Sequence, residues 1–275
     1  MTLFMDRALA RSLERTEGAI NAAFVEARAR SSPALGATHR EVDGTLLMFD
    51  GPDSPMTQSF GLGLSEQVSA GSLAGMEAFF ESRGAPVHHE VSPLAGIQTF
   101  RLLAERGYRP IELTTVLVQP LDASLEPPAL EGGLSVRAAR PEDAERWIET
   151  SVAGWGERAE VTDPIRDIAT VALASLATVN FLVEREGLAI ATGSLGIQGN
   201  IALLAGASTV PDHRGLGAQR ALLRVRLAEA KRRGCEIAVM GAEPGSTSQR
   251  NAERNGFRVA YTRVKWQKDA AKDTV

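Results

Sequence analysis

The sequence predicts an α/β (α+β) protein built from two copies of one fold. Short apolar runs with strand propensity alternate along the chain with segments whose apolar residues recur at helical spacing. The stretch 120–133 carries three prolines and a glycine pair without any periodicity, which is typical of a linker. A similar order of elements also recurs about 150 residues later in the chain. These observations favour two ordinary domains over a single large one.

The first half is expected to begin with an amphipathic helix within residues 1–30. Leu9, Leu13, Ile20 and Phe24 fall near helical spacing there, and the pattern breaks at Ser31-Ser32-Pro33. Asp43-Gly44, the strongest short hairpin signal, joins two short strands. The elements expected in this half are strands at 39–42, 45–49, 59–64, 86–91 and 111–118, and helices at 73–82 and 94–105.

The second half is expected to open with a strand followed by a helix that starts at Arg140-Pro141-Glu142-Asp143. Proline suits the first helical turn, and the acids suit the positive end of the helix dipole. Glu186-Gly187 predicts a turn between two paired strands. The elements expected are strands at 134–138, 180–184, 188–197, 201–210, 236–240 and after 257, and helices at 140–152, from 163, at 218–233 and at 246–255.

The repeat is anchored at two places. A helix that ends in Arg83-Gly84-Ala85 is matched by one that ends in Arg233-Gly234-Cys235, and 105–108 is matched by 253–257. The first copy contains no basic residue from 41 to 82, so it would repel an anionic cofactor. The alternative to a repeat is that the two halves are unrelated α/β segments. The expected boundaries are a degenerate first domain at 1–122, a linker at 123–133 and a complete second domain at 134–275.

Composition narrows the class of protein. A content of 44% hydrophobic and 23% charged residues is typical of a soluble globular protein, and the net charge of −4 disfavours nucleic acid as a partner. The single cysteine, Cys235, excludes an internal disulfide and is expected to be a buried thiol in a reducing cytoplasm. Charges interrupt the first 30 residues, and no apolar run approaches the length of a membrane span, so we expect no secretion signal and no membrane partner.

The turn from Ala205 to Gly217, AGASTVPDHRGLG, is predicted to bind an anion. A strand stops near Pro211, the chain passes Arg214-Gly215-Leu216-Gly217, and a helix starts at once. The first N–H groups of a helix have no intrahelical partner, and the helix dipole places partial positive charge there. Glycines lack Cβ, so phosphates can lie against bare backbone. The predicted ligand is a pyrophosphate, and a turn without any ligand is the alternative.

The helix after this turn is predominantly basic. Its only acid is Glu229, whereas the stretch from the turn to the end of the helix carries Arg214, Arg220, Arg224, Arg226, Lys231, Arg232 and Arg233. Arg220, Arg224 and Lys231 share one face, opposite an apolar stripe that includes Leu222 and Val225. This basic face either attracts an anionic ligand or is simply solvated. Nucleic-acid binding through it remains a third, less favoured hypothesis.

The arrangement resembles the GNAT superfamily of acyl-CoA-dependent N-acetyltransferases, whose signature is R/Q-x-x-G-x-G/A at a strand-to-helix turn. Arg214 and Gly217 match, whereas Gln219 replaces the final Gly or Ala. The resemblance covers roughly 134–275 and implies two tandem GNAT-like domains, each a mixed, mostly antiparallel sheet flanked by helices. It implies acetyl-CoA as the co-substrate and no metal. It assigns the cofactor to Val210, Arg214, Gly215, Leu216, Gly217, Ala218, Gln219 and Asn251.

Two catalytic groups common in this superfamily are absent. The strand 201–210 carries no carboxylate to act as a general base, and Ala252 stands where many members have a tyrosine that protonates the leaving thiolate. Glu243 and Tyr261 are weak substitutes that are more often structural, and Trp155 on a predicted loop is a weak candidate for the acceptor pocket. The catalytic residues therefore stay unknown at this point.

Two functional hypotheses are favoured over nucleic-acid binding. The first is an N-acetyltransferase acting on a primary amine of a small molecule or peptide, by direct attack in a ternary complex; the second is a non-catalytic acyl-CoA-binding regulator. The pair His88-His89 with Glu90 is not expected to bind a metal, because adjacent strand residues point to opposite faces. A monomer with pseudo-twofold halves and a homodimer are both compatible with the repeat.

Overall fold

The computed structural model describes residues 3–122, 130–155 and 162–269. The chain forms two compact units, one comprising 118–240 and the other comprising 2–117 together with 241–275. β5, Arg109–Pro120, and β10, Ile237–Ala242, each pass from one unit into the other. Each unit is described on its own below.

The unit that contains the N-terminal half begins with α1, Arg7–Ser31, which confirms the predicted amphipathic helix. The Asp6 side chain caps it by accepting a hydrogen bond from the Leu9 N–H at 2.8 Å, and the predicted apolar residues Leu13, Ile20 and Phe24 are buried. The other elements here are β1 Thr38–Val42, β2 Thr45–Phe49, β3 Gln58–Phe60, α2 Ala70–Glu81, β4 Val87–Val91, α3 Ile97–Glu105, α7 Thr247–Arg254 and β11 Arg258–Lys268.

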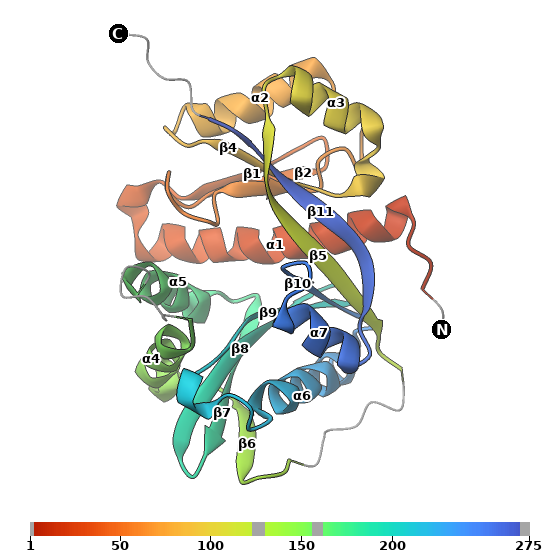
Figure 1. Ribbon diagram of the computed structural model, residues 1–275. Helices are drawn as coiled ribbons and strands as arrows, with labels where there is room; N and C mark the ends of the chain where they lie inside the picture. Colours follow the sequence, from red (N-terminus) through yellow and green to blue (C-terminus); the bar gives the residue numbers. More distant parts are fainter. Residues whose placement is uncertain (1–2, 123–129, 156–161, 270–275) are drawn as a thin grey trace. The chain divides into compact units, whose positions relative to one another are not determined.

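The sheet of this unit runs in the order β1-β2-β3-β4-β11-β5 (Figure 1). β1, β2 and β3 form an antiparallel meander, whereas β3 and β4 are parallel. β11 pairs antiparallel with β4, so that Val264 faces Val91. The final strand of the predicted second half thus completes a sheet of the first half. The compact units are defined by packing, and they group 241–275 with the N-terminal half. The predicted boundaries 1–122 and 134–275 instead mark where each copy of the repeat begins and ends, so they stay a prediction.

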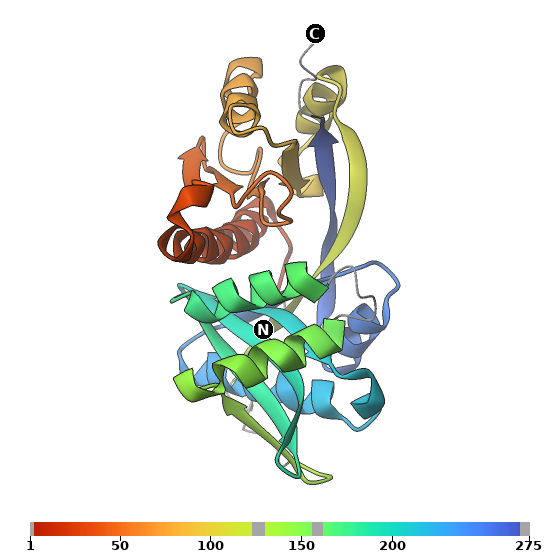
Figure 2. The ribbon, with the colours of Figure 1, turned by 90° about the vertical axis from the view of Figure 1, so that its left-hand side faces the viewer.

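The unit 118–240 contains β6 Leu134–Ala138, α4 Ala144–Trp155, α5 Thr162–Ala174, β7 Thr178–Arg185, β8 Leu188–Gln198, β9 Ile201–Thr209 and α6 Ala218–Arg232. Its strands follow the order β10-β9-β8-β7-β6. β6 to β9 are antiparallel neighbours, and β9 and β10 are parallel. α4 and α5 cover one face of this sheet and α6 covers the other (Figure 2).

The same topology therefore occurs twice. An antiparallel meander leads into a helix, a strand parallel to the last strand of the meander, a second helix and a long strand, as β1-β2-β3-α2-β4-α3-β5 and as β7-β8-β9-α6-β10-α7-β11. Both sheets are mixed and mostly antiparallel, which confirms the predicted architecture.

Some predicted boundaries were wrong. β3 ends at Phe60 rather than residue 64, because Gly61 and Gly63 adopt positive φ angles of 88° and 73° that break the strand. The helix predicted at 94–105 begins only at Ile97, after a short 3₁₀ turn and Gly96 with φ 86°. β9 ends at Thr209, one residue early, because Pro211 begins a 3₁₀ turn.

Residues 123–129 of the predicted linker lie outside the described residues. No helix in the described part of the chain is long and apolar enough to cross a membrane. Cys235 is buried, as predicted, and burial raises the pKa of its thiol.

Candidate functional site

The candidate site is built on β9, the strand that leads to the predicted glycine turn. Its parallel ladder with β10 covers three residue pairs and ends where Leu203 faces Val239. Its antiparallel ladder with β8 continues as far as Thr209, with a β-bulge opposite the segment between Thr192 and Ser194. Within this unit β9 therefore parts from β10 after Leu203 and continues beside β8 alone.

The glycine turn that follows β9 is open to solvent. Residues 214–217 are exposed, and Gly215 and Gly217 have φ angles of 80° and 82°, a left-handed conformation that favours glycine. A Cβ added at either position would meet no heavy atom within 4 Å. The backbone of the turn is thus accessible to a ligand from outside.

The N-terminus of α6 lies directly behind this turn and has no side-chain cap. Gly217 occupies the cap position without a side-chain hydrogen bond, and the first helical bond there joins the Ala221 N–H to the Gly217 carbonyl at 3.0 Å. The N–H groups of residues 218–220 precede that bond, and the helix dipole adds partial positive charge. These features fit a phosphate or pyrophosphate group.

Two side chains tie the turn to its surroundings. The Arg214 guanidinium lies 3.4 Å from the Thr209 carbonyl oxygen and 3.5 Å from the Gly154 carbonyl oxygen, at the ends of β9 and α4. The Gln219 amide donates to the Thr209 hydroxyl at 2.7 Å. Gln219, the departure from the superfamily pattern, therefore fastens the first turn of α6 to β9 through its side chain and leaves its backbone N–H at the helix start.

The other predicted cofactor residues of this unit differ in accessibility. Leu216 is 40% exposed on the turn, whereas Ala218 is buried beneath it. Val210 has partners for both backbone groups, because its N–H donates to the Ile190 carbonyl at 3.0 Å and its carbonyl accepts from His213 at 2.9 Å. Its assignment to the cofactor stays a prediction. Val210 would have to contact the cofactor through its side chain, or through a backbone group whose present hydrogen bond is broken.

Trp155, the weak candidate for the acceptor pocket, is the last residue of α4 and 53% exposed. Its predicted place on a loop was wrong, since α4 continues beyond the expected end at Val152. The preceding Gly154 lies so close to β9 that an added Cβ would collide with Ser208. Trp155 therefore projects from the end of a helix that packs against the candidate strand.

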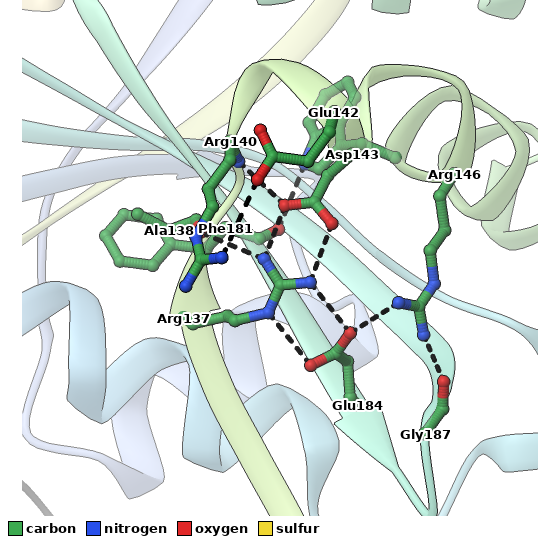
Figure 3. Close-up of polar contacts among 10 residues, drawn as sticks. Arg137, Ala138, Arg140, Glu142, Asp143, Arg146, Phe181, Glu184 and Gly187 are labelled. Carbon is green, nitrogen blue, oxygen red and sulfur yellow. Dashed lines mark hydrogen bonds and ion pairs between the residues drawn. The ribbon is translucent and has the colours of Figure 1, made fainter.

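A network of ion pairs fixes the start of α4 to the sheet (Figure 3). The Arg137 guanidinium on β6 bridges the carboxylates of Asp143 and Glu184, with contacts between 2.5 and 3.0 Å. Arg146 on α4 adds an ion pair to Glu184 at 2.7 Å. The hydrogen bonds from Arg137 hold the pKa of both carboxyls below their usual range. This network positions α4, and carboxylates engage both Arg137 and Arg146.

Three predicted residues belong to the other unit, and their described contacts lie within it. Glu243 and Asn251 are exposed, and the Asn251 carbonyl accepts from the Asn255 side chain at 2.7 Å. Tyr261 is 6% exposed, and its hydroxyl donates to Glu14 at 2.7 Å. Burial and the Glu14 carboxyl raise the pKa of Tyr261. These surroundings make Tyr261 part of a buried network, and a catalytic role for it or for Glu243 stays a prediction.

The histidine pair on β4 is also part of the protein interior. His89 is fully buried between the Ser59 hydroxyl at 2.6 Å and the Tyr108 hydroxyl at 3.2 Å, and burial lowers its pKa to about 3. His88 instead contacts the Thr57 carbonyl at 3.3 Å. In residues 3–122, 130–155 and 162–269 no group of three or more side chains is placed to hold a metal ion.

Sequence reasoning missed the buried position of Arg226. It was only counted among the basic residues of the stretch from the turn to the end of α6, whereas its side chain is 3% exposed and reaches the carbonyls of Ser194 and Ala205. The available signal was its spacing: Arg226 lies four residues after Leu222, which belongs to the apolar stripe.

Solved structures with known folds resemble this chain over most of its length. A GCN5-related N-acetyltransferase from Kribbella flavida matches with a TM-score of 0.62 and 15% identity, covering 90% of this chain and 96% of its own. The chain has the GNAT fold. A second GCN5-related N-acetyltransferase, from Sphaerobacter thermophilus, matches with a TM-score of 0.58 and 19% identity, covering 78% and 72% of the two chains.

The GNAT fold of this chain is of the tandem kind. A tandem GNAT protein from the clavulanic acid biosynthesis pathway matches with a TM-score of 0.58 and 14% identity, over 83% of this chain and 79% of its own. No protein-family model and no curated protein matches the sequence. At these identities the likeness establishes the fold alone, so the activity must be argued from the site.

Proposed function

We propose that this protein is an N-acetyltransferase that transfers an acetyl group from acetyl-CoA to a primary amine. The observation that carries the proposal is the uncapped N-terminus of α6 behind an exposed glycine turn, at the end of a strand that has parted from its neighbour. The GNAT fold supports acyl transfer in general, and its solved relatives named above are acetyltransferases.

The residues of the turn would hold the cofactor through backbone groups. The N–H groups of residues 215–219 would bind the pyrophosphate, whereas the Arg214 N–H already donates to the Pro211 carbonyl at 3.1 Å. Acetyl-CoA would supply the acetyl group as a thioester. Arg214 and Gln219 keep this backbone in place through their bonds to the end of β9. Within the unit 118–240, Trp155 at the end of α4 is the proposed wall of the acceptor pocket.

The amine would attack the thioester directly, within a complex that holds both substrates. β9 carries no carboxylate, so deprotonation of the amine must come from a residue outside this strand or from water. We propose a small-molecule or peptide amine as the acceptor and a reducing cytoplasm as the location, the latter because the only cysteine is a buried free thiol.

Calorimetry with acetyl-CoA tests the cofactor assignment. Gly217→Asp places a carboxylate against the pyrophosphate and is expected to weaken binding by at least about tenfold. Gly199→Asp is the matched control, because Gly199 also has a positive φ, 58°, and open space around its Cβ position. Wild-type affinity in Gly217→Asp would show that the cofactor binds elsewhere.

The alternative is a regulator that binds acyl-CoA without catalysis. It is favoured by the lack of a carboxylate on β9 and by the burial of the Tyr261 hydroxyl against Glu14. Incubation with acetyl-CoA and a broad panel of amines, with thiol release as the readout, separates the two. Tight binding without thiol release on any amine supports the regulator, and amine-dependent release supports the enzyme.

A further inference from the structure

Arg226 is a buried cation without a carboxylate partner among the described residues. Its guanidinium donates to the carbonyls of Ser194 at 2.9 Å and Ala205 at 3.2 Å, and its Nε has no hydrogen-bond partner. Burial lowers its pKa to about 10, and no neighbouring charge offsets this. An apolar side chain would fill the same space without the cost of burying a charge. What the arginine offers in return is its two hydrogen bonds to these carbonyls.

The two carbonyls that Arg226 contacts belong to facing residues of β8 and β9, at one end of the β8–β9 bulge. Ser194 faces Ala205 and the next pair is Thr192 with Ser208, so β9 has one residue more than β8 between the pairs. Gly193 makes room for the guanidinium, because a Cβ there would lie 3.1 Å from Arg226 Nη1. Glycine on β8 and arginine on α6 thus fit one another and hold the bulge.

The bulge turns one peptide group of β9 toward Arg226. The peptide between Ala205 and Gly206 is trans, so its N–H, which belongs to Gly206, points away from its carbonyl. The carbonyl accepts from Arg226 on the α6 side, and Gly206 is exposed with a φ of 60°. A bond from a cation to the carbonyl polarises the peptide and makes its N–H a stronger donor.

We propose that Arg226 is a positioning residue, which holds the β9 bulge and aims a strengthened Gly206 N–H at the carbonyl oxygen of a bound acyl thioester. The inference rests on the proposed function, because it requires the thioester to lie beside the segment of β9 that has parted from β10. It adds a residue on α6 that acts on the reacting carbonyl through a peptide group.

Infrared spectroscopy of acetyl-CoA labelled with ¹³C at the thioester carbonyl tests this role without knowledge of the acceptor. On binding to the wild-type protein the carbonyl band is expected to move to lower wavenumber, because a strong donor weakens the C=O bond. Arg226→Met is expected to lose most of this shift, and Arg226→Lys to retain part of it. With any amine that supports thiol release, Arg226→Met should lower kcat on the order of tenfold or more, with KM for acetyl-CoA little changed.

Arg232→Met is the matched control, since Arg232 lies on the same helix outside the basic face and its side chain is 70% exposed. CoA affinity measured by calorimetry confirms that each variant keeps its fold and its glycine turn. If the wild type does not bind acetyl-CoA, the proposed function fails and this inference fails with it. If acetyl-CoA binds but its carbonyl band does not shift in the wild type, or shifts equally in folded Arg226→Met, this inference alone is overturned. If Arg226→Met does not fold, an absent shift in the wild type still overturns the inference, and Arg226→Lys supplies the comparison with the control.

Discussion

The two glycine turns of the repeated fold share a left-handed backbone but have opposite surroundings. The first turn is Gly61-Leu62-Gly63. Its Leu62 is fully buried, and the Arg7 guanidinium donates to the carbonyls of Gly63 and Leu64 at 2.6 and 3.1 Å. In the second, the turn around Gly217 is exposed and nothing crowds its glycines. One turn is filled by the protein's own side chains, and the other is free for a ligand.

The helices that follow these turns differ in the same way. The N-terminus of α2 is closed by a capping box, in which the Ser69 and Ser72 side chains each accept a backbone N–H. α6 starts directly after its turn and has no side-chain cap. A glycine turn before a helix is therefore not sufficient for an anion site. What decides is whether the N–H groups at the helix start are left available.

The two units also treat buried charge differently. In the unit with the N-terminal half, Arg263 on β11 is paired with Glu14, Glu17 and Glu90 at 3.4, 2.7 and 3.0 Å. In the described part of the unit 118–240, the buried Arg226 donates to carbonyls and has no carboxylate partner. The first arrangement joins α1, β4 and β11 into one structure, and the second fits a role beyond packing.

The largest expected effect comes from removing the paired arginine. Arg263→Met leaves the buried carboxylates of Glu14 and Glu90 without their main partner and should lower the free energy of unfolding by about 3–5 kcal/mol. Arg109→Met, which breaks an ion pair more than half exposed, is the control and should cost at most about 1 kcal/mol. Urea unfolding measures both. A loss below that of Arg109→Met would mean that the network does not stabilise this unit.

Much of this comparison was predictable from the sequence. The helical spacing of α1, the Asp43-Gly44 hairpin and the repeated helix ends are local patterns, and the structure confirms the elements they predict. The glycine turn was located because Arg214, Gly215 and Gly217 follow a strand and precede a basic helix. The lack of basic residues from 41 to 82 distinguishes the first copy from the second in the sequence, and its loss of a cofactor site stays a prediction.

The remainder depends on contacts between distant parts of the chain, which spacing does not encode. Glu14 and Tyr261 are separated by 247 positions, and the pairing of β11 with β4 brings Val264 opposite Val91, 173 positions before it. Arg7 fills the first turn from α1, a contact that the charge count between 41 and 82 could not include. The spacing of Arg226 after Leu222 could have indicated its burial, but its contacts with Ser194 and Ala205 depend on a bulge, which composition does not reveal.

The second effect is the pH dependence of the stability that comes from the network of Arg263 with Glu14, Glu17 and Glu90. Burial raises the pKa of Glu14 from 4.5 to about 7, and Arg263 only partly opposes this. Because the folded state binds the proton more tightly, Glu14 stabilises the protein below pH 4.5, and this contribution is lost as the pH rises toward 7. Across that range wild type should lose up to about 3 kcal/mol relative to Glu14→Gln.

The measurement is a series of urea unfolding curves from pH 4.5 to 8 for the wild type and Glu14→Gln. The comparison is made between the two proteins because other carboxyls, such as Glu77, have lowered pKa values and act in the opposite direction. Arg263, Glu17, Glu90 and Tyr261 face Glu14 and stay the same in both. Parallel pH profiles would contradict a Glu14 that takes up its proton near neutral pH.

The smallest effect tests the two turns directly. Gly63→Ala places a methyl group 2.6 Å from the Thr99 hydroxyl at a φ of 73°, so both crowding and backbone strain should lower the unfolding free energy, by about 2–3 kcal/mol. Gly217→Ala meets open space and carries only the backbone strain, about 1 kcal/mol. Acetyl-CoA affinity should respond in the opposite order, staying at the wild-type value in Gly63→Ala and falling in Gly217→Ala. Equal losses of stability in both variants would mean that the second turn is as closely packed as the first, and that its N–H groups are not free for a ligand.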